Sequence, residues 1–170
     1  MSALKTARTL TRYNAWANQV FYDAVFALPP GEAEKPRATL FKNIVHTLNH
    51  NYVIDSIFRA HVEGRDHGYT ARNTANHPPL ADLWASQQEF DAWFIRWSDT
   101  LTTGRLDEVI DFTFVGGGAG AMTPNEIILH LIAHTSYHRG FAADMFFQVP
   151  TRAPTTDLPV FLRDARPQLD

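Results

Sequence analysis

The residues best suited to chemistry in this sequence are its histidines. The chain has 170 residues, with eight histidines and no cysteine. The lack of cysteine excludes a disulfide-stabilised scaffold, a cysteine zinc finger, a thiolate-held iron–sulfur cluster and a cysteine nucleophile. Imidazole is therefore the soft metal ligand that is left, and if sulfur takes part in the chemistry it must arrive on a substrate.

Spacing divides the histidines into two groups. Five lie on two predicted helices: His46 and His50 on one, and His130, His134 and His138 on the other. Residues four apart on an α-helix point within about 40° of each other, with Cβ atoms about 6 Å apart, so an HxxxH pair can chelate one ion. The other three lie at or beyond the end of a helix, where we expect solvated side chains: His61, His67 and His77.

His134 and His138 are predicted to face the protein interior, because they share a helical stripe with Leu131 and Met145. A buried imidazole without a partner is costly. A metal ion would satisfy both rings at once, and hydrogen bonds to carbonyl groups are the alternative. His130 lies at the edge of the stripe, about 80° from His138, which favours a half-exposed position and makes it a poorer third ligand.

A third imidazole from the other helix would complete a three-histidine site of the kind that zinc occupies. Helical periodicity does not choose between His46 and His50 for this role. Three neutral ligands leave the charge of the ion uncompensated, so the pKa of a bound water would fall towards about 7. A zincin peptidase needs Glu directly after the first histidine of HxxxH, and Thr135 stands there, which disfavours peptidase chemistry.

Four helices are expected to position these side chains, over residues 2–28, 38–62, 80–101 and 123 to about 147 or 148. Each shows apolar residues at helical spacing. Pro29-Pro30-Gly31 ends the first helix. Thr123 with Glu126 forms a capping box at the start of the fourth, with Pro124 at its first position.

The connections between these helices differ in kind. Residues 64–79 are predicted to form a long loop that permits a crossover. Residues 109–122 are predicted to form a small hairpin, with the glycines of 116–120 as its turn rather than as a phosphate loop. A short helical turn is predicted near 160–163. We expect one all-α domain over residues 1–170, a four-helix bundle whose core can hold a metal or cofactor site.

The composition limits the classes of partner that we expect this protein to bind. Hydrophobic residues make up 45% of the chain, and the net charge is −3, so no basic surface for nucleic acid is predicted. No signal peptide or membrane-spanning segment is evident. We therefore expect a soluble cytoplasmic protein that binds neither nucleic acid nor a membrane.

Three motifs carry a resemblance to a known family. They are Tyr13-Asn14-Ala15-Trp16-Ala17-Asn18 on the first helix, Thr47-Leu48-Asn49-His50 followed by Asp55 on the second, and His134-Thr135-Ser136-Tyr137-His138-Arg139-Gly140 on the fourth. In order and spacing they resemble the DinB-like (damage-inducible) metal-binding helical bundles over nearly the whole chain. The sequence departs from the family pattern at Ala133 and Phe141, where the family commonly has Asn and Gln, so we expect altered hydrogen bonding around the site.

This resemblance implies a four-helix bundle with a long crossover between the second and third helices, a homodimer, and a divalent ion held by three histidines. By position these ligands are His50, His134 and His138, which leaves His46 a structural role. Zinc or nickel is favoured as the ion over iron or manganese. Tyr137 and Arg139 flank the second of the two ligands on the fourth helix. We expect both to serve the helix surface, and the binding of an anionic group is the alternative.

The resemblance also implies a function. Some relatives are similar to thiol-dependent S-transferases and maleylpyruvate isomerases, so we expect a metal-dependent transferase or isomerase that acts on a small-molecule substrate with a low-molecular-weight thiol. The alternatives are a non-catalytic metal-binding stress-response module and a metal-dependent hydrolase of a small ester or amide. Asp55 is expected to be a salt-bridge partner rather than a general base, and no catalytic residue is assigned.

Overall fold

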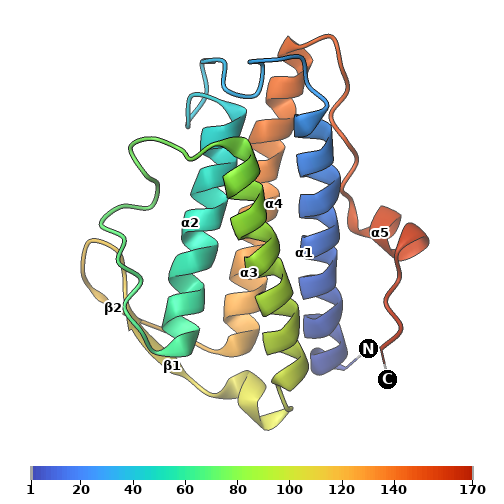
Figure 1. The fold of residues 1–170 in the computed structure, drawn as a ribbon. Helices are drawn as coiled ribbons and strands as arrows, with labels where there is room; N and C mark the ends of the chain where they lie inside the picture. The colour runs from blue at the N-terminus through green and yellow to red at the C-terminus, as the bar shows by residue number, and fades with distance from the viewer. Residues whose placement is uncertain (1, 170) are drawn as a thin grey trace.

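Four long helices form the body of the molecule in the computed structural model, which describes residues 2–169 (Figure 1). They are α1 (Ala3–Phe26), α2 (Ile44–Glu63), α3 (Leu80–Thr100) and α4 (Pro124–Asp144). The shorter elements are the 3₁₀ turns η1 (Gly104–Asp107) and η2 (Met145–Gln148), the strands β1 (Ile110–Thr113) and β2 (Ala119–Met122), and α5 (Leu158–Asp164). The predicted all-α four-helix bundle with a hairpin before the last long helix is confirmed.

The helices are arranged so that α1 and α4 run in one direction and α2 and α3 run in the other (Figure 1). Hydrogen bonds connect Thr11 of α1 to Ser98 of α3 and Asn18 to Asp91, which shows that α1 and α3 are antiparallel. Because α2 and α3 are parallel, the chain must return along the bundle between them. Residues 64–79 do so, and the predicted crossover is confirmed.

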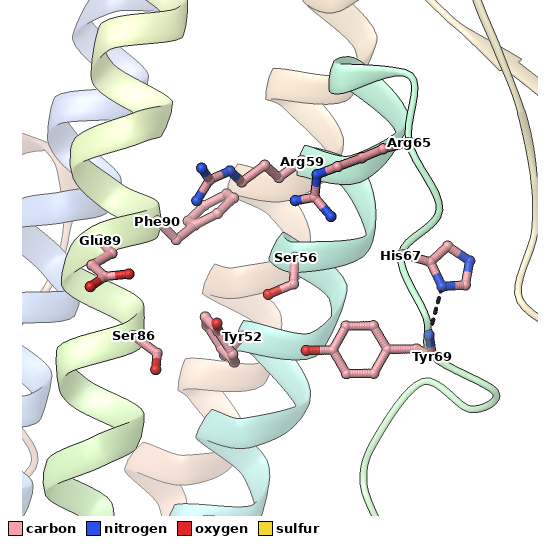
Figure 2. Close-up of a pocket in the computed structure, with 9 residues that line it drawn as sticks. All are labelled: Tyr52, Ser56, Arg59, Arg65, His67, Tyr69, Ser86, Glu89 and Phe90. Carbon is pink, nitrogen blue, oxygen red and sulfur yellow. Dashed lines mark hydrogen bonds between the residues drawn. The ribbon is translucent and has the colours of Figure 1, made fainter.

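The crossover is held against α2 by its own side chains and backbone. Gly64 ends α2 with a φ of 65°, the left-handed conformation that glycine adopts without steric cost. Farther along, the backbone N–H of Tyr69 donates to Nδ1 of His67 (Figure 2), and the Arg72 carbonyl accepts from His50. The crossover therefore contacts the helix that carries part of the predicted metal site.

Two helix boundaries differ from the prediction by more than two residues. The second helix was expected from residue 38, but residues 38–43 form turns and bends. Lys42 has a φ of 70°, which no helix accommodates, and the Asn43 side chain accepts a hydrogen bond from the backbone N–H of His46 and so caps α2. The fourth helix begins at the predicted capping box, but after Asp144 it tightens into η2.

The predicted hairpin is present, with β1 antiparallel to β2 and Ile110 opposite Met122. Gly116, Gly117 and Gly118 all have positive φ, so the glycine run is a turn, as expected. At the end of the chain, α5 packs Phe161 against Tyr13 and Trp16 of α1.

Two apolar clusters fill the ends of the bundle. One lies towards the hairpin end and includes Ile57, Phe94 and Leu131, and the other surrounds Phe21, Leu83 and Phe146. Between them the interior is polar, with these side chains buried: Asn14, Asn18, Asp55, Gln87, Asp91 and Arg139. Among the residues described, none of the helices combines the length and apolar composition that crossing a membrane requires.

Candidate metal centre

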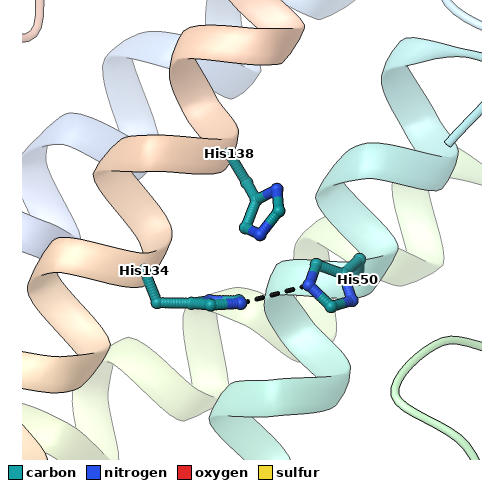
Figure 3. Close-up of side chains that lie close together, drawn as sticks. All are labelled: His50, His134 and His138. Carbon is teal, nitrogen blue, oxygen red and sulfur yellow. Dashed lines mark hydrogen bonds between the residues drawn. The ribbon is translucent and has the colours of Figure 1, made fainter. Parts of the chain in front are cut away.

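Three imidazoles meet between two helices. His50 projects from α2 towards His134 and His138 of α4 (Figure 3). One ring nitrogen from each lies within 4.8 Å of the others, and Nε2 of His50 is 3.1 Å from Nε2 of His134. The ring centroids are 4.5–4.9 Å apart. The spacing of four residues on α4 brings two of the rings to one face, and the antiparallel packing of α2 supplies the third.

The crossover orients His50. Its Nδ1 lies 2.6 Å from the carbonyl oxygen of Arg72, and because a carbonyl only accepts, this nitrogen carries the proton. Nε2 then presents its lone pair towards the other two imidazoles. Such an outer hydrogen bond is the arrangement that sets the tautomer of metal-binding histidines. In residues 2–169, Nδ1 of His134 and Nδ1 of His138 are buried without a hydrogen-bond partner.

Burial keeps the three rings neutral. It lowers the pKa of His134 to about 3 and that of His138 to about 4, and it lowers the pKa of His50 as well. Neutral imidazoles have free lone pairs at physiological pH. In a tetrahedral site with Zn–N distances of about 2.0–2.1 Å, ligand nitrogens lie about 3.3 Å apart, so this cluster fits a divalent ion with small side-chain adjustments.

Aromatic rings surround the imidazoles. Phe41, which precedes α2, stacks on His50 with centroids 4.4 Å apart and lies 5.4 Å from His138. Phe141, which stands where the family commonly has Gln, stacks near His138 at 5.8 Å. Phe41 was expected within the second helix. Its place in the turn before α2 instead lets it cover the site, and the site has apolar walls.

The remaining helical histidines lie outside this cluster. Nε2 of His46 is 2.9 Å from the Thr74 carbonyl, so this ring ties α2 to the crossover. His130 is half-buried against Phe58, with ring centroids 4.7 Å apart, in agreement with its predicted half-exposed position.

The three histidines expected to be solvated are in fact half-buried. His61 stacks on Phe112 of β1 at 4.5 Å, and His67 accepts the backbone N–H of Tyr69. His77 donates from Nδ1 to its neighbouring Pro78 carbonyl. The prediction was wrong because the crossover and the hairpin fold back over the end of α2, which the spacing of residues within one helix does not reveal.

Arg139 was expected on the helix surface, but it is 3% exposed. Its Nη1 donates to Asn18 at 2.9 Å and lies 3.3 Å from Asn14. Asn18 in turn donates to both carboxylate oxygens of Asp91 at 3.0 Å. These residues form a buried polar network that links α1, α3 and α4 beside the imidazole cluster, and sequence periodicity gave no sign of it. Tyr137, by contrast, is exposed as expected.

Asp55 was expected to be a salt-bridge partner, but among the described residues it makes no ion pair. It is fully buried and accepts a hydrogen bond from Gln87 at 3.0 Å. Burial raises its pKa well above the ordinary value, and burial raises the pKa of Asp91 to about 7. Both carboxyl groups lie in the polar layer of the bundle rather than in the imidazole cluster.

Comparisons with known proteins agree with this architecture. The model of the DinB family matches residues 1–169. Among curated proteins, the chain is 24% identical over 164 residues to "Protein DinB" of Bacillus subtilis (strain 168), an alignment that covers 90% of this chain and 91% of that protein.

Proposed function

The chain belongs to the DinB family, and we propose that its three clustered imidazoles hold a divalent metal ion that activates a small-molecule thiol for a transfer or isomerisation reaction. The ligands in this proposal are His50, His134 and His138. The observation that carries it is the composition of the cluster, which consists of three neutral imidazoles from two helices. No carboxylate belongs to it within the described residues.

A ligand set without negative charge suits Lewis-acid chemistry. A divalent ion bound here supplies positive charge that lowers the pKa of a thiol or water approaching its open side. Imidazole ligands accept several divalent ions, zinc, nickel and iron among them. We propose zinc or nickel, with iron or manganese as the alternatives.

The surrounding residues favour a sulfur ligand over a charged oxygen ligand. The rings of Phe41 and Phe141 lie beside His50 and His138, and sulfur makes favourable contacts with aromatic rings. Because the chain has no cysteine, the thiol must belong to a substrate. The hydrogen bond from His50 to the Arg72 carbonyl keeps the Nε2 lone pair directed at the site while the substrate binds.

A second candidate is a non-catalytic role in which the ion only stabilises the bundle. It is favoured by the origin of the ligands, since His50 comes from α2 and the other two come from α4. An ion held by both helices would act as a cross-link in the folded state.

Elemental analysis of purified variants tests the metal site. We expect the wild-type protein to contain about one ion per chain, and His50→Ala, His134→Ala and His138→Ala each to lose most of it, because each leaves only two of the three imidazole ligands. His130→Ala is the matched control, since it removes an α4 imidazole outside the cluster. Near-stoichiometric metal in all three ligand variants would refute the assignment.

A thiol screen separates the two candidates. With metal-loaded protein, saturable turnover that disappears in His138→Ala and persists in His130→Ala is the result expected of the enzyme. Full metal occupancy without turnover of any thiol substrate, together with a large loss of thermal stability on chelation, would instead favour the non-catalytic role.

A further inference from the structure

A cavity opens on the other side of α2 from the imidazoles. Its volume is about 200 Å³, and it lies between α2, α3 and the first residues of the crossover (Figure 2). At 100° per residue, Ser56 and Arg59 lie about 240° and 180° around the helix from His50. The cavity is therefore separate from the candidate metal centre.

Two arginines from different elements converge on this cavity. Arg59 belongs to α2 and Arg65 to the crossover, and both line it. Each binds Glu63 through Nε, at 2.9 Å and 2.6 Å respectively, so one carboxylate holds the two guanidinium groups in place. Arg59 also packs over the ring of Trp93 at 5.2 Å. Apart from Glu63, Arg59 has no hydrogen-bond acceptor among residues 2–169, which leaves its Nη groups available.

The rest of the lining is rich in hydrogen-bond donors. Tyr52, Ser56 and Tyr69 contribute hydroxyl groups, and that of Tyr69 points towards Ser56 (Figure 2). Burial raises the pKa of Tyr69, so this hydroxyl stays protonated. His67 also lines the cavity, and its Nδ1 accepts the Tyr69 backbone N–H.

We propose that this cavity binds a small molecule through a phosphate or carboxylate group, with Arg59 and Arg65 as its principal partners. Guanidinium groups present parallel N–H donors that match the oxygens of both kinds of anion. The volume accommodates the anionic group and a few further atoms, which limits the ligand to a small molecule or to the anionic end of a larger one.

Glu89 provides a test of whether the cavity binds an anion or a cation. It is an exposed residue on α3 and the only carboxylate among the residues lining the cavity. Glu63 is already neutralised by the two arginines. A carboxylate at the rim repels an anion and attracts a cation. Removing the charge of Glu89 must therefore strengthen the binding of an anion, whereas a cavity built for a cation would lose affinity.

Calorimetric titration of the metal-loaded protein, in a buffer without phosphate and at low salt, tests the proposal with inorganic phosphate and succinate as probes. We expect saturable binding of at least one probe, weakened about tenfold or more in Arg59→Gln and Arg65→Gln because each removes a charge-assisted donor. Arg96→Gln removes an exposed arginine of α3 that does not line the cavity, so it should weaken binding far less than either cavity variant. Glu89→Gln should tighten binding several-fold.

Tyr69→Phe keeps both arginines and the Glu63 contacts and removes only one hydroxyl, so it tests the cavity without disturbing the ion pairs. It should weaken binding while the metal content and the thermal unfolding midpoint stay at wild-type values. The probe whose affinity depends on both arginines identifies the anion class. Binding of neither probe, equal binding in Arg65→Gln and Arg96→Gln, or weaker binding in Glu89→Gln would overturn the proposal.

Discussion

At the residue scale, burial gives the imidazoles of the candidate site a measurable pH signature. In the metal-free protein, His134 and His138 have pKa values near 3 and 4, whereas an unfolded histidine titrates near 6.5. Between these values the unfolded chain binds protons that the folded protein does not, so the free energy of unfolding falls as the pH is lowered from 6.5. With these pKa values, we expect each of the two rings to contribute a loss of about 3 kcal/mol by pH 4.

Urea unfolding of the chelator-treated protein at a series of pH values measures this effect. Asp91 acts in the opposite direction, because its pKa is raised to about 7 and its stabilising contribution is lost as the pH rises through that value. The informative quantity is therefore the difference between variants. His134→Leu should flatten the pH dependence below 6.5. Parallel curves for wild type and His134→Leu would contradict the prediction.

The pairing of His134 with His138 was predictable because it depends only on helical geometry. The choice between His46 and His50 was not, since both lie on α2 and only tertiary contacts distinguish them. The crossover binds His46 through Thr74 and binds His50 through Arg72, but only His50 faces α4. Family resemblance pointed to His50, and the structure brings that ring to the other two.

At the element scale, the polar layer shows what periodicity misses. A buried polar face and a solvent-exposed face have the same hydrophobic pattern, so the expectation of a surface position for Arg139 followed from its residue type alone. The structure places Arg139 against Asn14 and Asn18 of α1. The start of α2 was missed for a related reason, because Leu40 and Phe41 continue the apolar pattern through a segment that the backbone of Lys42 turns out of the helix.

The buried polar network around Arg139 also leads to a prediction about the stability of the fold. Arg139→Leu should lower the free energy of unfolding by about 3–5 kcal/mol, because within residues 2–169 it removes the one cation from a buried layer that includes Asp55 and Asp91. Chemical denaturation at pH 8, where Asp91 is largely ionised, should show the greatest loss. Arg96→Leu, an exposed change on α3, is the control and should cost less than about 0.5 kcal/mol.

If Arg139→Leu unfolds at the same denaturant concentration as the wild type, then the buried carboxyl groups are protonated and need no cation. Asp91→Asn combined with Arg139→Leu distinguishes this case. The double variant should recover part of the lost stability, since it removes the uncompensated charge together with its partner.

At the scale of the whole molecule, the bundle has two apolar ends joined by a polar middle. The imidazole cluster lies between α2 and α4, and the Arg139 network connects α4 to α1 and α3. All four long helices therefore make polar side-chain contacts near the middle of the bundle, where apolar packing contributes least. A metal ion at the cluster would strengthen the contact between α2 and α4, which the Arg139 network does not join directly.

This arrangement predicts how the whole fold responds to metal removal. An ion present at 1,000 times its dissociation constant stabilises the folded state by about 4 kcal/mol, and about 1 kcal/mol shifts the melting temperature of a domain this size by about 2–4 °C. Excess chelator should thus lower Tm by about 8–16 °C, as followed by circular dichroism. His134→Ala should melt near the chelated wild-type value and show no further change with chelator.

His130→Ala should respond as the wild type does, because its imidazole lies outside the cluster. A chelator effect of equal size in His134→Ala would place the stabilising ion elsewhere in the molecule.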